Sequence, residues 1–324
     1  MKKIFTILVL TAALALSVAG LAGCDFDGVR NVADPSELQS DEQIFGFSAA
    51  SAATVISAMN GGAAAETAAA KKLALANGEV TDEALIGELN GYMMLVESLL
   101  SEGGFGFKTS VSDTEGYDRM MSVTYRDMTG NTIEYVMYYN ETVISERTER
   151  DDDIFEDEET ETVSRIDGII RIDGADYPME GVSEASTEGD ETETEHRLTV
   201  TISGSSYLRV EQSAESERGE DEQEYAYSLY ENGALTERSA FEYERENDET
   251  EIRLEQRVRG EDGRYTSNVF YFDKETVRGE EVILIRVGDR NATAAYTVSI
   301  RDNGDGTSDY VYTYAEGSLE YDRD

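Results

Sequence analysis

The feature that most constrains this chain is a two-residue hydrophobic alternation that begins near Phe105 and continues to the C-terminus. It is clearest at residues 198–203, 252–259 and 296–301, where Leu, Val, Ile and Tyr alternate with Thr, Ser, Arg and Glu. Such alternation is typical of antiparallel strands with one buried and one wet face. Because no helical pattern interrupts it, the sequence predicts an antiparallel meander and excludes a βαβ order.

Turn sequences recur about every 10–16 residues and divide this region into roughly 12–15 hairpin-linked strands. The clearest are Thr129-Gly130-Asn131, Asp173-Gly174, Asn232-Gly233, Asp262-Gly263 and Gly304-Asp305-Gly306. A sheet of more than about ten strands rarely stays flat. We therefore expect a large curled sheet over residues 105–324, either an open barrel, a half-barrel or a sandwich.

Residues 41–104 have a helical pattern instead, and we expect two or three helices there. Residues 46–59 and 63–76 are rich in Ala and other helix formers, and each stretch is followed by a glycine-containing stop. The third helix begins after Thr81 as the N-cap and carries one apolar stripe, formed by Leu85, Leu89, Tyr92, Val96 and Leu99.

A stripe of this kind is typical of core packing, and a surface for a partner helix is the alternative. Packing is the simpler outcome, because the concave side of a curled sheet is the nearest apolar surface. The sequence therefore predicts an α+β, mainly β fold in which residues 41–104 and 105–324 form one body. Helices inside a curled sheet would resemble the half-barrels of bacterial envelope lipoproteins that act as carriers and sensors, an analogy of fold alone.

The N-terminus has the three parts of a secretion signal. Lys2 and Lys3 form a positive start, residues 4–18 are largely apolar, and small residues lead to Leu21-Ala22-Gly23-Cys24. This last sequence resembles the lipobox of bacterial lipoproteins. The resemblance implies that a signal peptide is cleaved before Cys24 and that a diacylglycerol is attached to the cysteine sulfur.

The resemblance also implies a location. Residues 1–23 would be the signal peptide, and residues 24–40, which are polar and aperiodic, a lipid-anchored tether. The mature protein would then sit on the extracytoplasmic face of the cell membrane, with further acylation such as palmitate adding to the anchor. An uncleaved spanning helix over residues 4–23 is the alternative.

Acidity dominates the composition, with 69 Asp and Glu against 27 Lys and Arg and a net charge of −42. Nucleic acid is excluded as a partner, because its binding depends on neutralising phosphates with basic side chains. Anionic lipid head groups are repelled for the same reason. The partners that fit this charge are cations, basic peptides and basic proteins, whereas plain solvation of a secreted protein is the simplest alternative.

The acidic residues gather in alternate turns. Short turns lie near residues 204, 232, 262 and 288, and longer acidic ones near residues 190, 220, 248, 278 and 305. In a meander, alternate connections leave the sheet at the same end. We therefore expect one end of the sheet to be much more acidic than the other.

Side chains that could support catalysis are sparse. His196 is the only histidine, and by parity it shares the buried face of a strand with Leu198, Val200 and Ile202. No G-x-S-x-G sequence presents a serine nucleophile. The acids fall on wet faces and in turns, where nothing raises a pKa for glycoside hydrolysis. We therefore expect no enzyme and no cofactor.

Calcium is the one metal that the sequence leaves open, as weak binding at millimolar concentration. Asp302-Asn303-Gly304-Asp305-Gly306 is superficially similar to an EF-hand loop, but Arg301 stands where the first carboxylate belongs. A hairpin turn explains this segment better. The run of acids at 151–159 has no spacing that specifies a cage.

Tyrosine is abundant, with 19 residues and no Trp, and several lie two or four apart on one strand face: Tyr135 and Tyr139, Tyr225 and Tyr227, and Tyr310, Tyr312 and Tyr314. Cross-strand core packing is the simplest explanation, and a Tyr-lined ligand face is the alternative.

Two functions fit: a non-enzymatic binding module for a hydrophobic or peptidic ligand, or a structural or adhesive surface protein that engages cations or basic partners. A weak similarity at a spacing of about 90 residues, as between Tyr139 and Tyr230 with their neighbours, leaves a duplication open.

Overall fold

The computed structural model describes residues 30–32, 38, 40–60, 82–100, 104–149, 159–189, 191–217, 220–246, 249–260, 263–304, 308–315 and 317–322. Cys24, the predicted signal peptide (residues 1–23) and the predicted helix at 63–76 lie outside the described residues. The acidic run at 151–158 and Asp305 lie outside them too. Within the described ranges, no helix is both long enough and apolar enough to cross a membrane.

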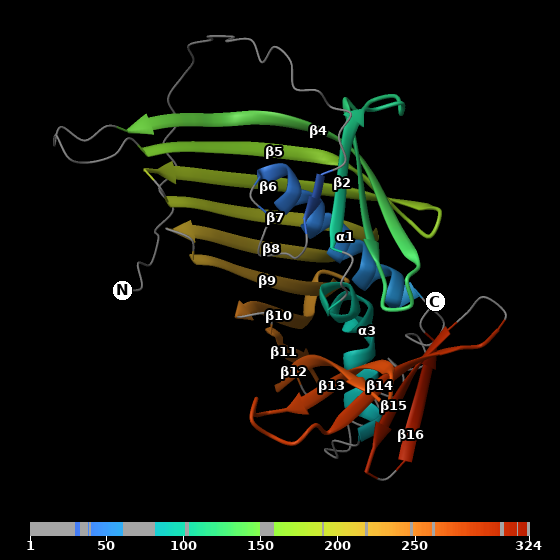
Figure 1. Ribbon diagram of the computed structural model, residues 1–324. Helices are drawn as coiled ribbons and strands as arrows, with labels where there is room; N and C mark the ends of the chain where they lie inside the picture. The colour runs from blue at the N-terminus through green and yellow to red at the C-terminus, as the bar shows by residue number, and fades with distance from the viewer. Residues whose placement is uncertain are drawn as a thin grey trace.

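The fold is mainly β, with one antiparallel sheet of 16 strands and two described helices (Figure 1). The helices are α1 (Asp41–Asn60) and α3 (Asp82–Leu100). The strands are β1 (Arg30–Val32), β2 (Phe105–Val111), β3 (Arg119–Arg126), β4 (Thr132–Glu149), β5 (Glu159–Ile172), β6 (Ala175–Glu188), β7 (Glu191–Ser203), β8 (Ser206–Glu217), β9 (Glu220–Glu231), β10 (Ala234–Glu246), β11 (Glu249–Arg259), β12 (Tyr265–Val277), β13 (Glu280–Val287), β14 (Tyr296–Asp302), β15 (Ser308–Tyr314) and β16 (Gly317–Asp322).

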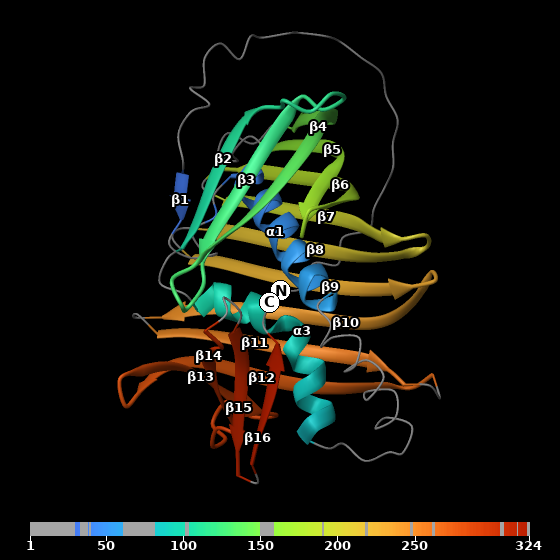
Figure 2. The same cartoon turned by 90° about the vertical axis from the view of Figure 1, so that its right-hand side faces the viewer.

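Each strand pairs with the next along the chain, so the predicted meander is confirmed. All the strands belong to one sheet, which rules out the sandwich alternative for the described residues. The outermost strands of that sheet, β1 and β16, are not paired with each other, so the sheet is open. In Figure 2 the helices lie in front of the central strands, while β2–β4 and β15–β16 stand forward on either side of them.

A capping box starts α1. Ser40 Oγ accepts a hydrogen bond from the Gln43 backbone N–H at 3.3 Å, and Gln43 Oε1 accepts one from the Ser40 N–H at the same distance. This reciprocal pair satisfies amide donors that a helix N-terminus leaves open. Gly46 then lets the helix approach the sheet, because a Cβ at this position would lie only 2.5 Å from Met121 Sδ. The Ala- and Ser-rich sequence of α1 therefore reflects close packing.

The apolar stripe of α3 packs as predicted. Leu89 and Val96 are fully buried, and the other stripe residues are at most 8% exposed. The Tyr92 ring lies 5.6 Å from the Phe241 ring of β10, at an interplanar angle of 52°. Described residues of the two helices belong to the same hydrophobic cluster as residues of the sheet.

The tyrosine stripes belong to this core. Tyr135, Tyr139, Tyr225, Tyr227, Tyr310 and Tyr312 are each at most 5% exposed, which confirms the packing interpretation. From α1, Phe47 contacts the Tyr225 ring at 4.9 Å. Aromatic pairs at this separation add about 0.5–1.5 kcal/mol beyond their buried area.

A buried carboxylate on α3 joins two distant parts of the sheet. Glu97 is 1% exposed, and its Oε1 accepts a hydrogen bond from the Met128 N–H at 2.7 Å. Its Oε2 accepts a hydrogen bond from the Tyr310 hydroxyl. Met128 lies in the β3–β4 turn and Tyr310 in β15, so the sheet curls far enough for both to reach the same side chain.

The prediction of an unstructured tether over 24–40 is wrong for part of that segment. Arg30–Val32 pairs with β2, and Leu38 is only 4% exposed within the core cluster. A strand of three residues is too short to show an alternation, which is why the sequence pattern missed it. The folded body therefore begins before residue 41.

The 90-residue similarity gives a mixed result. Tyr139-Asn140-Glu141 lies inside β4, whereas Tyr230-Glu231 ends β9 and Asn232 lies in the turn that follows. The second match, Glu159-Thr160-Glu161 with Glu249-Thr250-Glu251, begins a strand in both places, β5 and β11. A duplication therefore stays a prediction.

Candidate functional site

The strands β4–β9 extend well beyond α1 on one side of the molecule (Figure 1). The described helices do not cover the sheet there, and residues 141–148 of β4 are all exposed. We call this region the acidic end and define it by the strand segments 145–149, 159–163, 184–188, 191–195, 213–217 and 220–224. Toward the core, it ends at a buried polar row of residues, described below, that contacts α1 through Gln212.

Six glutamates occupy one register position across six successive strands of the acidic end. We call this row the glutamate ladder: Glu149, Glu159, Glu188, Glu191, Glu217 and Glu220. Neighbouring strands lie about 4.8 Å apart, so the ladder spans roughly 24 Å. The side chains of Glu159, Glu188 and Glu191 are described, and all three are exposed. Like charges directly opposite each other destabilise a sheet, so these three neighbours have an energetic cost.

Two carboxyl groups next to the ladder, on the same outer face, show the influence of burial and of neighbouring acids on their pKa. Partial burial raises the pKa of Glu193, and the carboxylates of Glu195, Glu215 and Glu191 raise it further. Partial burial likewise raises the pKa of Glu184, with Glu161, Glu195 and Glu193 adding to the effect. Arg197 opposes the rise at Glu184 but does not reverse it. The outer face of the acidic end is therefore a surface whose negative charge is only partly neutralised.

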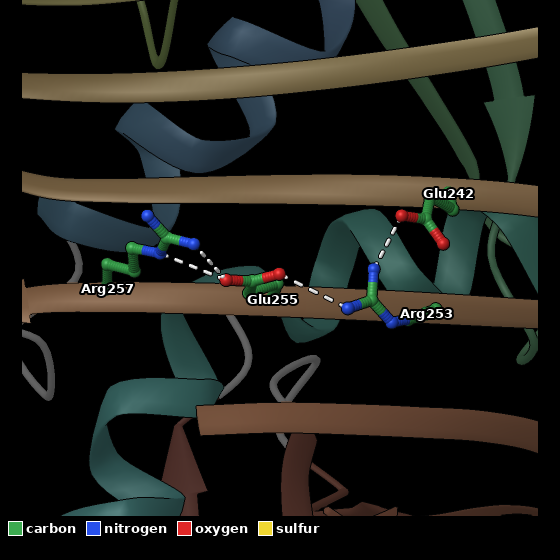
Figure 3. Close-up of polar contacts among 4 residues, drawn as sticks. All are labelled: Glu242, Arg253, Glu255 and Arg257. Carbon is green, nitrogen blue, oxygen red and sulfur yellow. Dashed lines mark hydrogen bonds and ion pairs between the residues drawn. The ribbon is translucent and has the colours of Figure 1, made fainter. Parts of the chain in front are cut away.

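The same outer face is neutralised farther along the sheet, on β10 and β11 (Figure 3). Arg253 lies between two acids there, with its Nη1 2.5 Å from Glu242 Oε1 and its Nη2 3.2 Å from Glu255 Oε2. Arg257 Nη2 lies 2.6 Å from Glu255 Oε1. Hydrogen bonding by Arg257 is the largest cause that lowers the pKa of Glu255. Each of these acids contacts an arginine, whereas at the acidic end most outer-face acids lie opposite other acids, with Arg147 opposite Glu161 as an exception.

The inner face of the acidic end has a different chemistry, because it carries small neutral side chains. Thr160, Thr187 and Thr192 share one register position, and a second row is formed by Thr162, Ala185, Thr194 and Ala214. Successive strand residues point to opposite faces. The repeated Glu-Thr sequence therefore places the glutamates on one face and the threonines on the other.

A buried polar row separates the acidic end from the helix-covered core. It consists of Ser164, Ser183, His196 and Gln212, which are at most 5% exposed and lie in register on β5–β8. Ser183 Oγ lies 3.3 Å from His196 Nε2, and Ser48 of α1 donates a hydrogen bond to Gln212 Oε1. His196 lies on the buried face as predicted, with a serine hydroxyl as its contact.

Burial dominates the chemistry of His196. Desolvation lowers its pKa to about 4, so the imidazole is neutral at physiological pH. The Ser183–His196 pair has the residue types of a nucleophile and its base, but both side chains lie beneath α1 and out of contact with solvent. The geometry therefore fits a structural hydrogen bond.

The predicted calcium segment forms part of a turn. Asp302 Oδ1 accepts a hydrogen bond from the Gly304 N–H at 2.7 Å, and Gly304 has a φ of 78°. This geometry is that of an Asx-type turn between β14 and β15. Among the described residues, no cluster of three or more His, Cys, Asp or Glu side chains could hold a metal ion.

The strand order bears out the predicted division of turns. Since every strand reverses direction, the connections after β6, β8, β10, β12 and β14 leave the strands at the opposite end from the connections after β7, β9, β11 and β13. The acidic turns near 190 and 220 include part of the ladder, but its extension across β4 and β5 could not be predicted from the turns alone. Glu159-Thr160-Glu161-Thr162 and Glu191-Thr192-Glu193-Thr194 were the available signal, although only the register aligns them.

Comparison with known proteins gives no relative: no family model, no curated protein and no solved structure matches the chain.

Proposed function

We propose that this chain is a lipid-anchored, non-enzymatic binding protein that uses the acidic end of its sheet to bind basic peptides or basic surfaces of proteins. The observation that carries the proposal is the glutamate ladder, together with the acids next to it on the outer face. Closely spaced carboxylates cost stability, and a cationic partner offsets that cost when it binds.

The shape of the charge favours an extended partner over a single ion. Carboxylates distributed over six strands cannot converge on one calcium, which takes six to eight oxygen ligands at 2.3–2.6 Å. Lys and Arg side chains spaced along a peptide or a protein surface can each reach a different carboxylate. Divalent cations then act as weak competitors of such a partner.

A hydrophobic ligand on the concave face receives less support. That face is where α1 and α3 pack, with Phe47, Tyr92, Leu89 and Val96 buried against the sheet. The helices thus occupy, wherever they are described, the surface on which such a ligand would lie. We therefore place the binding surface beyond the helices, and we infer that the curled sheet is a half-barrel whose interior serves as a core.

The anchor is part of the proposal and rests on Leu21-Ala22-Gly23-Cys24. Two acyl chains on Cys24 would hold the protein stably at the extracytoplasmic face of the cell membrane. Cys24→Ser should release the mature protein from membranes while leaving its thermal melting unchanged, because the cysteine lies well before the first described strand. Retention of Cys24→Ser in membranes after a high-salt wash would favour an uncleaved helix.

Binding is tested with an octalysine peptide and two matched triple variants. Glu159, Glu188 and Glu191 are changed to Gln in the first variant, and the exposed Glu180, Glu231 and Asp289 are changed to the matching amides in the second. Both variants lose three negative charges, so a general charge effect weakens binding equally. We expect the ladder variant to bind about tenfold more weakly than the control variant, as expected for three exposed charge contacts. Equal affinities in the two variants would refute the acidic end as the binding surface.

A further inference from the structure

We propose that residues 141–148 of β4 form a strand-addition site, at which an extended peptide with an apolar centre and basic flanks pairs with the open edge of the sheet. The proposal rests on the proposed function, because it specifies where and how a basic partner is held. It adds backbone pairing to the electrostatic attraction of the acidic end. The partner must therefore bind as an extended strand, and positive charge alone is not enough.

The edge arises because β3 stops short of the end of β4. Their pairing runs from Arg126 opposite Thr132 to Arg119 opposite Tyr139. The side chain of Asn140 then holds the turn that precedes β3. Its Oδ1 accepts a hydrogen bond from the Asp118 N–H at 2.9 Å, and its Nδ2 donates one to Gly116 O at 3.0 Å.

Beyond Asn140, β4 continues to Glu149 with a single partner strand among the described residues, β5. Figure 1 shows no described element beside this half of β4 on its outer side. A strand in this position has backbone N–H and C=O groups along one edge without a partner strand. Such an edge is a template for pairing with another chain.

The side chains along this edge are unusual for an exposed strand. Val143 is 57% exposed and Ile144 is 59% exposed, and both are adjacent to the bulge in the pairing with β5. Natural edges are commonly protected by Lys, Pro or a bulge that twists the strand. This edge has the bulge but no Lys or Pro between residues 141 and 149. The apolar pair therefore remains accessible at the centre of the segment.

Charge selects the occupant of the edge. Glu146 lies on one side of the apolar pair, and the glutamate ladder begins on the same strand at Glu149. Glu141, on the other side, is paired with Arg119 at 3.0 Å, and Arg147 lies between Glu146 and Glu149. A second copy of this chain would bring a like-charged acidic end into contact with the first. A peptide with Val or Ile at its centre and Lys or Arg on both sides is attracted instead, because the adjoining acidic end gives this side of the sheet an excess of negative charge. We therefore assign a basic strand-forming peptide to this site rather than a second copy of the chain.

The first experiment separates backbone pairing from charge. The probe is a seven-residue peptide of alternating Lys and Val with blocked ends, and the control is the same peptide N-methylated at alternate residues, which loses donors along one edge but keeps every charge. We expect at least tenfold weaker binding of the N-methylated peptide by fluorescence anisotropy. Hydrogen exchange should show slower exchange of the backbone amides of residues 141–148 only with the unmethylated peptide.

The second experiment uses two variants that add the same charge. Ile144→Lys places it on the edge, and Val182→Lys places it on β6, an interior strand whose Val182 is 40% exposed on the outer face. Each variant is first checked for an unchanged thermal midpoint. We expect Ile144→Lys to weaken binding of the Lys-Val peptide at least tenfold and Val182→Lys to weaken it less than threefold.

Several outcomes would overturn the strand-addition site. Equal binding of the two peptides, equal loss in the two variants, or amide protection away from 141–148 would each do so while leaving the proposed binding of basic partners intact. A dimer of the free protein with residues 141–148 already protected would make a second copy the occupant. If neither octalysine nor the Lys-Val peptide binds, the site and the proposed function both fail.

Discussion

The strands β5–β8 each run through two different environments, and the difference separates what stabilises this protein from what we propose it uses for binding. On β7, His196, Leu198 and Val200 are at most 5% exposed where the helices cover the sheet. At the acidic end of the same strand, Thr194 on this face is still buried, whereas Thr192 is exposed, as are Glu191 and Glu193 on the outer face. Backbone pairing is continuous across both parts. Regular pairing alone is therefore enough to extend a strand, whereas side-chain burial is concentrated in one half of it.

The two halves also respond oppositely to acid. At His196 the folded state disfavours the protonated form, because burial lowers its pKa. At Glu193 and Glu184 the folded state favours the protonated form, because burial and neighbouring carboxylates raise their pKa. Acidification should thus weaken the core and relieve repulsion at the acidic end. Each of the following changes tests one side of this contrast.

The largest effect is expected in the covered half. Leu89→Ala removes a fully buried side chain from α3 and should lower the free energy of unfolding by about 2–5 kcal/mol, through lost transfer energy and a cavity. Thr160→Ala, at the acidic end, should cost less than about 1 kcal/mol. Urea denaturation of the two variants measures both. Equal costs would mean that the acidic end is packed as tightly as the core.

The next effect is the pH dependence carried by His196. Its folded pKa of about 4 lies below the ordinary value of 6.5, so the unfolded chain binds more protons between these pH values. The stability present above pH 6.5 is therefore lost as the pH falls toward 4, by at most about 3 kcal/mol. His196→Gln should remove this part of the pH dependence in unfolding measured from pH 7 to 4. A variant with the wild-type pH profile would contradict the assignment.

A smaller effect of opposite sign is expected at the acidic end. At pH 7, Glu193→Gln should stabilise the protein by about 0.2–1 kcal/mol, because it removes repulsion between adjacent carboxylates. Since the folded pKa of Glu193 is raised, the gain should disappear as the pH falls through that value. Glu255→Gln is the matched control, because the pKa of Glu255 is lowered by its arginine partners. We expect this control to destabilise the protein at pH 7 in the same chemical denaturation assay.

The smallest effect is expected for the paired charges on the outer face of β11 (Figure 3). Arg257→Met breaks the contact of Arg257 with Glu255 and should cost about 0.5 kcal/mol or less, because the arginine is well exposed. The cost should shrink further in 1 M NaCl, where screening acts over about 3 Å. A loss that persists in high salt would point to packing by the arginine stem rather than to charge.

The sequence predicted the features that depend on local residue patterns. Alternation and turn glycines predicted the meander, and the spacing of Leu85, Leu89 and Val96 predicted the buried side of α3. Parity placed His196 on the buried face. In each case the relevant neighbours are at most a few residues apart, so one strand or helix is enough to express the pattern.

The features that the sequence did not predict depend on how separate elements align. The glutamate ladder exists only in a particular register, and a shift by one residue would place threonine opposite glutamate. The open edge of β4 depends on where β3 ends, and Asn140 is the residue that marks that point. The composition therefore indicated an acidic surface, but the sequence did not show where on the fold the candidate surfaces lie.

The contacts of Glu97 have a consequence for how the chain folds. Its partners Met128 and Tyr310 lie far apart in the sequence, and Tyr310 is 213 residues from Glu97. Hairpins between adjacent strands form from local contacts, but α3 cannot complete its polar contacts until β15 exists. We therefore expect docking of α3 to be a late step, because β15 is the second-last strand along the chain. A fragment that ends before residue 308 should keep its early hairpins yet hold α3 loosely, with faster amide exchange in residues 82–100 than in the full chain.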